Sequence, residues 1–273
     1  MCKMIKPYFE TELGKLYCDN CLRILLDLPD NYIDLTITSP PYGNLRDYKD
    51  YVFNFEGIAN ELYRITKTGG IVVWIVGDES INGSETGISF QQALFFQKIG
   101  FNKHDTMIYM KDGMSYPEIT RYHQIFEYMF IFSKNKPKTF NPLVRANLQR
   151  GRFLKFTDRQ KNGSTVLSDS HCIKKETQYG NIWCYKTGFS KSSKDKIAFE
   201  HPAIFPEELA MDHILSWSNP SDLILDPMSG SGTVLKIAEL AKRKWIGIDI
   251  SREYCEITKK RLEQTTKQKA LFN

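Results

Sequence analysis

The segment 38–42 combines hydrogen-bond acceptors, a rigid backbone and an aromatic ring. Pro40 and Pro41 fix φ and carry no N–H, so the segment presents the Ser39 hydroxyl and the Pro40 carbonyl as acceptors. The exocyclic amine of a nucleobase is a poor nucleophile because its lone pair is delocalised into the ring. Two acceptors that hold its N–H bonds can return the lone pair to nitrogen, and Tyr42 can stack on a base extruded from a duplex. The alternative is a rigid turn that only ends a strand.

A second segment, 226–233, places Gly230 and Gly232 between an apolar run and a predicted helix. Glycines at such a turn let the backbone approach a ligand closely, with the amides of the helix N-terminus facing it. Asp249 ends the next apolar run, about 20 residues further on, where an acid can accept hydrogen bonds from ribose hydroxyls. A tight turn alone would explain the glycines but not the acid. The two features together predict a site for a nucleoside-containing cofactor.

The apolar runs indicate which elements must position these segments. Buried strands are predicted at 32–38, 70–76, 106–109, 127–133, 223–225 and 245–248. Spacing of 3.6 residues predicts helices at 55–65, 90–99, 207–217, 233–241 and 253–262, with fraying expected from residue 265. Strands that alternate with helices predict an open α/β sheet covered on both faces, with 106–109 and 127–133 as neighbours.

Charge is distributed unevenly along the chain. The net charge of the 273 residues is +5, yet the stretch 134–196 contains fifteen Lys and Arg against four Asp and Glu. The segment 134–199 is also rich in Ser, Asn and Gly and only weakly periodic. It therefore predicts a polyanion-binding insert in a mildly acidic scaffold. A solvated lysine-rich loop is the alternative.

Cys18 and Cys21 form a CxxC pair, but no second CxxC or Cys/His cluster completes a four-ligand site. We therefore predict no metal and reduced thiols rather than a disulfide framework. The longest apolar runs, 71–76 and 128–132, are far shorter than the roughly 20 residues of a membrane span. The N-terminus carries no apolar stretch of signal-peptide length. A cytoplasmic protein that contacts no membrane is expected.

Together these segments resemble the amino-methyltransferases of DNA modification, which methylate cytosine N4 or adenine N6. Residues 39–42 match the family's catalytic tetrapeptide, 226–233 match its cofactor loop, and 201–206 match its segment beside the cofactor's methionine end. Residues 126–134 resemble the strand after the target-base pocket, and Asp19 the acid near the cofactor's adenine. The catalytic segment comes first, the basic segment second and the cofactor loop last. That order resembles the β class of these enzymes.

The resemblance implies a circularly permuted Rossmann-like α/β methyltransferase fold that binds S-adenosyl-L-methionine. Residues 1–133 would form its catalytic half, 134–199 its target-recognition insert and 200–273 its cofactor-binding half. The implied catalytic residues are Ser39, Pro40, Pro41 and Tyr42. The implied cofactor residues are Asp19, Phe205, Pro206, Asp226, Pro227, Ser229, Gly230, Gly232, Thr233 and Asp249. The basic insert supplies the DNA-binding candidates Arg145, Arg150, Arg152, Lys155, Arg159, Lys174 and Lys175.

In the family that the chain resembles, Ser at the first tetrapeptide position goes mostly with cytosine N4, and Asp goes mostly with adenine N6. Ser39 therefore favours site-specific methylation of cytosine N4 in double-stranded DNA, with adenine N6 as the alternative. The motif order disfavours an RNA or protein amine methyltransferase, and the intact motifs disfavour a catalytically inactive DNA-binding protein. The resemblance also allows a homodimer and a separately encoded restriction endonuclease, and implies a prokaryotic or phage origin.

Overall fold

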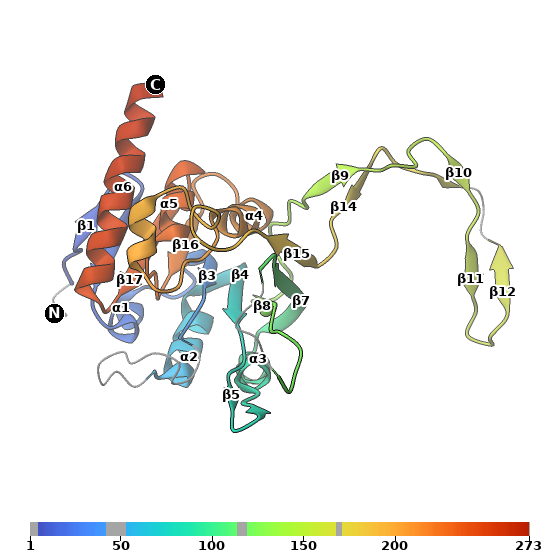
Figure 1. The fold of residues 1–273 in the computed structure, drawn as a ribbon, viewed down its shortest axis with the longest axis horizontal. Helices are drawn as coiled ribbons and strands as arrows, with labels where there is room; N and C mark the ends of the chain where they lie inside the picture. The colour runs from blue at the N-terminus through green and yellow to red at the C-terminus, as the bar shows by residue number, and fades with distance from the viewer. Residues whose placement is uncertain (1–4, 42–52, 114–118, 168–170, 273) are drawn as a thin grey trace. The chain divides into compact units, whose positions relative to one another are not determined.

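The computed structural model describes residues 5–41, 53–113, 119–167 and 171–272, with side chains up to residue 266 (Figure 1). The chain divides into two compact units. The large unit comprises Met1–Asn141 and Asn181–Asn273, and the ribbon unit comprises Pro142–Gly180. Within the described ranges, every helix is too short or too polar to cross a membrane.

A nine-stranded sheet of order β1-β2-β17-β16-β3-β4-β8-β7-β15 forms the centre of the large unit. Its strands are β1 (Phe9–Glu10), β2 (Gly14–Cys18), β3 (Ile33–Thr38), β4 (Thr66–Val76), β7 (Asn102–Lys111), β8 (Phe126–Ser133), β15 (Ile182–Tyr185), β16 (Leu223–Asp226) and β17 (Lys244–Asp249). β2, β17, β16, β3 and β4 are parallel neighbours, and β8 runs antiparallel between β4 and β7. The parallel strands therefore end at one edge, where open α/β sheets bind ligands.

Helices cover both faces of this sheet (Figure 1). One face packs against α1 (Cys21–Asp27), α2 (Phe55–Ile65) and α3 (Ile88–Lys98). The other packs against α4 (Glu207–Trp217), α5 (Thr233–Leu240) and α6 (Arg252–Phe272). β4 contributes to both cores, with Ile71, Val73 and Ile75 on the α4–α6 face and Val72, Trp74 and Val76 on the α1–α3 face. Burial on two faces explains why its sequence is continuously apolar rather than alternating.

The predicted strands and helices are all present, and β7 pairs antiparallel with β8 as predicted. The prediction of fraying from residue 265 is wrong, because α6 continues to Phe272. Thr265 is buried, and its hydroxyl donates to the Arg261 carbonyl at 2.9 Å, so this turn packs against the large unit. Sequence reasoning did not predict β2, α1, the 3₁₀ helix η1 (Lys196–Glu200) or the hairpin of β5 (Ser80–Ile81) and β6 (Ser84–Glu85).

The ribbon unit, Pro142–Gly180, covers only the middle of the insert predicted at 134–199. On the N-terminal side, Lys134 Nζ donates to the carbonyls of Tyr63 and Thr66 at 2.8 and 2.9 Å. On the C-terminal side, β15 pairs in parallel with β7 and extends the sheet. Both flanks thus belong to the large unit. Local charge, which set the predicted boundaries, carries no information about such pairing.

The ribbon unit is a series of two-stranded antiparallel ladders. β9 (Val144–Ala146) pairs with β14 (Glu176–Gln178), β10 (Phe153–Leu154) with β13 (His171–Cys172), and β11 (Thr157–Arg159) with β12 (Thr165–Leu167). Its described residues, 142–167 and 171–180, include no buried side chain. Two-stranded ribbons are marginally stable alone in water. This unit therefore has no hydrophobic core to hold it, and its eight Lys and Arg outnumber its three Asp and Glu.

Candidate active site

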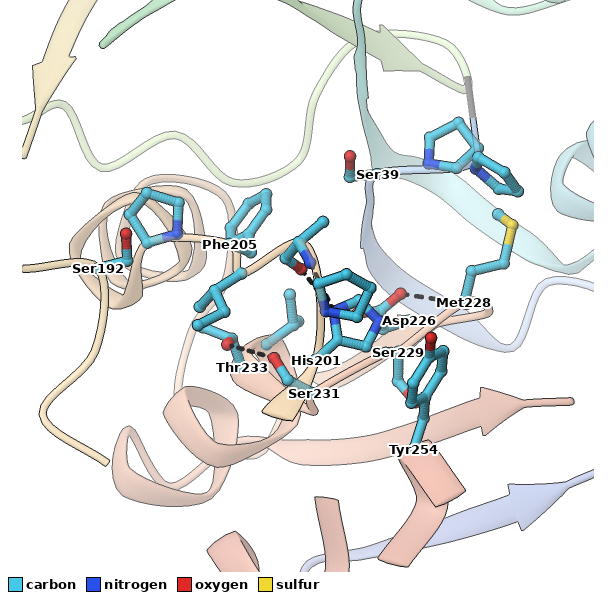
Figure 2. A pocket seen from close by; sticks show the side chains of 18 of the residues that line it. Ser39, Ser192, His201, Phe205, Asp226, Met228, Ser229, Ser231, Thr233 and Tyr254 are labelled. Carbon is cyan, nitrogen blue, oxygen red and sulfur yellow. Dashed lines mark hydrogen bonds between the residues drawn. The ribbon is translucent and has the colours of Figure 1, made fainter. Parts of the chain in front are cut away.

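A pocket of about 720 Å³ lies at the carboxyl edge of the large unit's sheet (Figure 2). Its lining includes the predicted catalytic segment 39–41, parts of 187–206 and of 226–234, and Asp249 and Tyr254. The adjacent strands β17, β16 and β3 bring these distant segments together. A largely apolar cavity of this size with a few convergent polar groups is typical of a small-molecule or cofactor site.

The loop from β16 to α5 adopts a backbone that requires glycine at two positions. Gly230 and Gly232 have φ of +50° and +73°. A Cβ at Gly230 would lie 2.9 Å from His201 Nε2, and one at Gly232 would lie 2.5 Å from Thr258 Cγ2. Gly232 is also the N-cap of α5, so the amides of the first helical turn face the loop. The loop backbone therefore packs closely against the side chains of His201 and Thr258.

Ser229 shows that this loop fits a polar ligand. Its hydroxyl is buried, it lines the pocket, and no hydrogen-bond partner for it exists among the described residues. A buried hydroxyl without a partner costs free energy that a ligand's polar group would recover.

Asp249 faces the pocket and also holds the loop. Its Oδ2 accepts a hydrogen bond from the Gly230 amide at 2.7 Å, and its Oδ1 accepts one from the Ser251 amide at 2.9 Å. Burial raises the pKa of Asp249 to about 6, although the bonds from Ser251 and Gly230 oppose that shift. A carboxylate oxygen has more than one lone pair, so both oxygens can still accept from a ligand. Asp249 can therefore hold the loop and still accept hydrogen bonds from ribose hydroxyls, as predicted from the sequence.

Asp226 connects the cofactor loop to the catalytic segment. Its Oδ1 accepts hydrogen bonds from the Thr38 hydroxyl at 2.9 Å and from the Met228 amide at 3.2 Å. Burial raises the pKa of Asp226 to about 7, against the effect of those two bonds. Thr38 is the last residue of β3 and precedes Ser39 directly. The carboxyl group of Asp226 thus sets the position of one loop relative to the other.

The catalytic segment leaves β3 at the pocket. Ser39, Pro40 and Pro41 all line it, with Pro40 buried and Ser39 half-buried. Figure 2 shows Ser39 in the same pocket as Asp226 and Thr233. Tyr42 lies outside the described residues, so its stacking role stays a prediction.

Most of the predicted cofactor residues meet at this pocket. Those that line it are Phe205, Pro206, Asp226, Pro227, Ser229, Gly230, Thr233 and Asp249. Gly232 shapes the loop without being part of the lining. Asp19 also lies outside the lining, where its Oδ1 accepts the Asn20 amide at 2.7 Å and pairs with Arg23 at 3.3 Å. The structure therefore does not bring Asp19 to the pocket with the others.

The seven predicted DNA-binding cations are all exposed on the ribbon unit. One of them, the Arg145 guanidinium, lies 5.7 Å from the centroid of the Tyr179 ring. Their role in binding DNA stays a prediction.

Sequence reasoning missed several residues of the pocket. Tyr109 and Lys111 come from β7 and Glu127 from β8, and Lys111 Nζ pairs with Glu127 Oε1 at 2.6 Å. Tyr254 reaches the pocket from α6, with its ring centroid 4.3 Å from that of His201. The sequence predicts a strand over the segment containing Glu127 but assigns Glu127 itself no role. A single acid or base at a strand end carries no signal that it faces a cavity.

A cluster of two cations and two carboxylates lies behind the loop. The Arg261 side chain, 0% exposed, donates to Asp195 Oδ2 at 3.0 Å and to Glu207 Oε1 at 2.8 Å. Lys236 Nζ donates to the same two oxygens at 2.7 and 2.8 Å. Burial opposes ionisation of Asp195, but hydrogen bonds from Lys236 and Arg261 outweigh it and lower its pKa. Each of the four side chains therefore has a partner of opposite charge within the cluster.

Arg261 extends this network to the cofactor loop. Its Nη1 donates to the Ser231 carbonyl at 2.6 Å and to Thr233 Oγ1 at 3.0 Å. One guanidinium on α6 thus joins the loop to α4 through Glu207 and to the segment before η1 through Asp195. That segment connects β15 to the wall formed by Phe205 and Pro206.

Known proteins resemble this chain over most of its length. A family model described as DNA methylase, of the N6 and N4 methyltransferases, matches residues 33–260. The orphan methyltransferase M.BamHII of Bacillus amyloliquefaciens is 56% identical over 243 residues, which cover 87% of this chain and 91% of that protein. The Type II methyltransferase M.BamHI of the same species is 30% identical over 288 residues, covering 98% of this chain and 61% of that protein.

Solved structures show the same fold. The cytosine-N4-specific PvuII DNA methyltransferase superposes with a TM-score of 0.69 at 20% identity, covering 96% of this chain and 93% of that one. M1.HpyAVI, determined as a complex with S-adenosylmethionine, gives a TM-score of 0.61 at 23% identity, covering 91% and 99%.

Fold and site thus define an S-adenosylmethionine-dependent methyltransferase of the Rossmann-like type. Its glycine loop comes after the catalytic segment in the chain, as in the β class. The chain belongs to the DNA methylase family, whose members methylate the exocyclic amines of cytosine or adenine.

Arg261→Met is expected to lower the free energy of unfolding by about 3 kcal/mol or more, because it removes a buried cation from a network of charges. Urea denaturation at pH 7 measures this change. Arg23→Met is the matched control, since Arg23 forms an exposed pair with Asp19 and should change stability by less than about 1 kcal/mol. Equal effects of the two substitutions would show that the buried network does not stabilise the fold.

Proposed function

We propose that this protein transfers a methyl group from S-adenosyl-L-methionine to the exocyclic N4 of cytosine in a short sequence of double-stranded DNA. One observation carries the proposal. Ser39 and Pro40 line the same pocket as the 226–233 loop and Asp249, so acceptors for an amine adjoin a site for a nucleoside cofactor. Support for cytosine comes from Ser39, because Ser at this position goes mostly with cytosine N4 in the family. Adenine N6 is the alternative.

The cofactor fits residues of the pocket that are otherwise unexplained. Asp249 can accept from the ribose hydroxyls, and the Ser229 hydroxyl and the first amides of α5 can bind polar groups of the methionine part. Phe205 and Pro206 form the apolar wall beside it. When bound, S-adenosylmethionine supplies an electrophilic methyl group on a sulfonium.

The catalytic segment acts on the other reactant. The Ser39 hydroxyl oxygen and the Pro40 carbonyl accept the N–H bonds of the amine and thereby return electron density to its nitrogen. The bond from Thr38 to Asp226 keeps this segment at a fixed position relative to the cofactor loop. A base in a duplex cannot reach such a pocket, so the target base must leave the stack, where Tyr42 is proposed to receive it.

The ribbon unit is proposed to bind the DNA. It is exposed, carries an excess of cations and is thin enough to enter a groove, as two-stranded β-ribbons do in the major groove. Neutralisation of phosphates by these cations would supply most of the affinity. A partner endonuclease is not required by this proposal, since relatives of the chain include both an orphan enzyme and Type II enzymes.

The proposed reaction predicts N4-methylcytosine as the product. Purified protein is incubated with unmethylated bacterial DNA and labelled S-adenosylmethionine, and the DNA is digested to nucleosides for mass spectrometry. Ser39→Ala should lower kcat by about 100-fold or more, the scale for losing one preorganised hydrogen bond at a reacting centre. Its affinity for DNA should stay within about twofold, as expected for a group that does not contact phosphates. Ser84→Ala, an exposed serine in β6, is the control.

N6-methyladenine as the only product would overturn the assignment of the base and keep the reaction type. Full activity of the Ser39→Ala variant would remove Ser39 from the mechanism. A protein that binds DNA but yields no methylated nucleoside would contradict the proposed activity.

Cofactor affinity is expected to increase with pH between 5.5 and 7.5. Burial raises the pKa of Asp226 to about 7 and that of Asp249 to about 6, so both carboxyls are largely neutral at the acid end. A cationic ligand favours the ionised forms and releases protons on binding, so Kd falls by up to about tenfold per pH unit for each linked proton. Above about pH 8, where Asp226 is fully ionised, the dependence levels off. Titration calorimetry in several buffers measures Kd and proton release together.

Asp226→Asn should weaken binding and remove most of the dependence between pH 6.5 and 7.5. A wild-type Kd that is constant across this range would contradict the link between Asp226 ionisation and the cofactor.

Removal of single ribbon cations is expected to weaken DNA binding in a salt-dependent way. Arg152→Ala should reduce the slope of log K against log salt concentration by about 0.9 if Arg152 neutralises one phosphate. Fluorescence anisotropy at several salt concentrations measures the slope. Lys244→Ala is the control, because Lys244 is exposed at the start of β17, at the sheet edge opposite the pocket. The same measurement is made for alanine variants of all seven predicted DNA-binding cations. An unchanged slope in every one of them would contradict the DNA-binding role of this unit.

A further inference from the structure

The pocket continues beyond the catalytic segment, on the side away from the cofactor loop. In the sheet, β16 and β17 lie on one side of β3, while β4, β8 and β7 follow on the other. Asp226 and Asp249 end strands on the first side. Lys111 ends β7 on the second side, and Glu127 is the second residue of the antiparallel β8, so both lie at the same carboxyl edge. The catalytic segment thus stands between the cofactor residues and a second group of polar residues.

Lys111 and Glu127 form a defined charged pair within this second region. Their Nζ and Oε1 atoms are 2.6 Å apart, and 32% and 16% of their side chains are exposed. Lys111 Nζ also lies 5.8 Å from the centroid of the buried Tyr109 ring. The Lys111 amide donates to the Ile125 carbonyl at 2.7 Å, so its backbone is held by the sheet. The ammonium is therefore positioned by a carboxylate, a ring and a rigid strand.

The chemistry of this pair suits the edge of a nucleobase. An ammonium has three N–H donors, which one carboxylate oxygen cannot take up. Beside its amine, cytosine presents two acceptors, N3 and O2. Uracil and thymine present an N–H at position 3 instead, which an ammonium repels. Extruded bases are read through hydrogen bonds to this Watson–Crick edge.

We propose that Lys111, oriented by Glu127, donates hydrogen bonds to the N3–O2 edge of the extruded cytosine while Ser39 and Pro40 hold its amine. Lys111 is then a specificity-determining residue and Glu127 a positioning residue. The inference rests on the proposed function, because it takes the pocket beyond Ser39 as the site of the target base.

The other ligand that an ammonium could hold is the cofactor's carboxylate. The first amides of α5 already provide an anion site on the cofactor side. Lys111 is separated from that side by β3, β4 and β8 in the sheet order. This arrangement favours the base over the cofactor as the partner of Lys111, and the two assignments give different results in the experiment below.

The test compares target bases in the wild-type protein and in Lys111→Met. Once the methylated sequence has been mapped, duplexes are made with cytosine, uracil or an abasic site at the target position. Affinities are measured with S-adenosylhomocysteine present. The preference for cytosine over uracil should fall about tenfold in Lys111→Met, while affinity for the abasic duplex changes less than about twofold. Mismatch effects on base extrusion are equal for both proteins and cancel in this comparison.

Two controls separate base reading from a structural role. Lys103→Met removes an exposed lysine at the other end of β7 and should leave the cytosine preference unchanged. Duplexes with 3-deazacytosine at the target should bind the wild-type protein more weakly, with a much smaller effect in Lys111→Met. The wild-type arm of that comparison also tests the proposal if the variant fails to fold.

An unchanged cytosine preference in Lys111→Met would overturn the inference. Loss of S-adenosylmethionine binding in this variant without DNA would overturn it also, by assigning Lys111 to the cofactor. Failure of the proposed function is recognised separately, because the wild-type protein would then form N6-methyladenine or no methylated nucleoside.

Discussion

The hydrogen bond from the Thr38 hydroxyl to Asp226 Oδ1, 2.9 Å long and buried, joins two loops that are 188 residues apart in sequence. It spans the neighbouring strands β3 and β16, whose carboxyl ends carry the catalytic segment and the cofactor loop. Placing a carboxyl group here is costly, as its raised pKa shows. In return, the proposed acceptors for the amine and the residues proposed to hold the cofactor keep a fixed separation. A methyl transfer needs this alignment, because its reacting atoms must approach in line.

The remainder of the large unit holds this arrangement in place. Asp249 accepts a hydrogen bond from the Gly230 amide of the loop, and Arg261 donates one to the Ser231 carbonyl. These two bonds hold the loop in position. Arg261 and Lys236 also hold Asp195 and Glu207. Since Asp195 and Glu207 flank the wall formed by Phe205 and Pro206, the part of the chain that follows the ribbon unit is tied to the cofactor loop. Such a tie matters in this chain because the segments 39–42 and 226–233 are far apart in sequence.

The ribbon unit follows a different physical rule. Its described residues bury no side chain, so backbone hydrogen bonds hold its ladders together. Its cations stay exposed to solvent. That composition suits a surface that reads a polyanion, whose phosphates can be neutralised by exposed Lys and Arg. The large unit has the opposite character, with two apolar cores on the two faces of its sheet.

Sequence alone predicted most of the long strands and helices of the large unit and the two loops that line its pocket. Continuous apolar runs predict β3, β4 and β17 because strands buried on both faces cannot alternate. The prolines at 40 and 41, the glycines at 230 and 232 and the acid at 249 predict both loops because each residue type has a local backbone or charge consequence.

Tertiary structure alone decided which residues share the pocket. Lys111, Glu127 and Tyr254 reach it from β7, β8 and α6, while Asp19, predicted at the cofactor, does not line it. The limits of the ribbon unit were also set by tertiary structure, since β15 was not predicted from sequence yet pairs with β7. The physical reason is common to these cases. Local propensity follows from neighbours in the chain, whereas pockets, ion pairs and sheet edges form between residues that only the fold brings together.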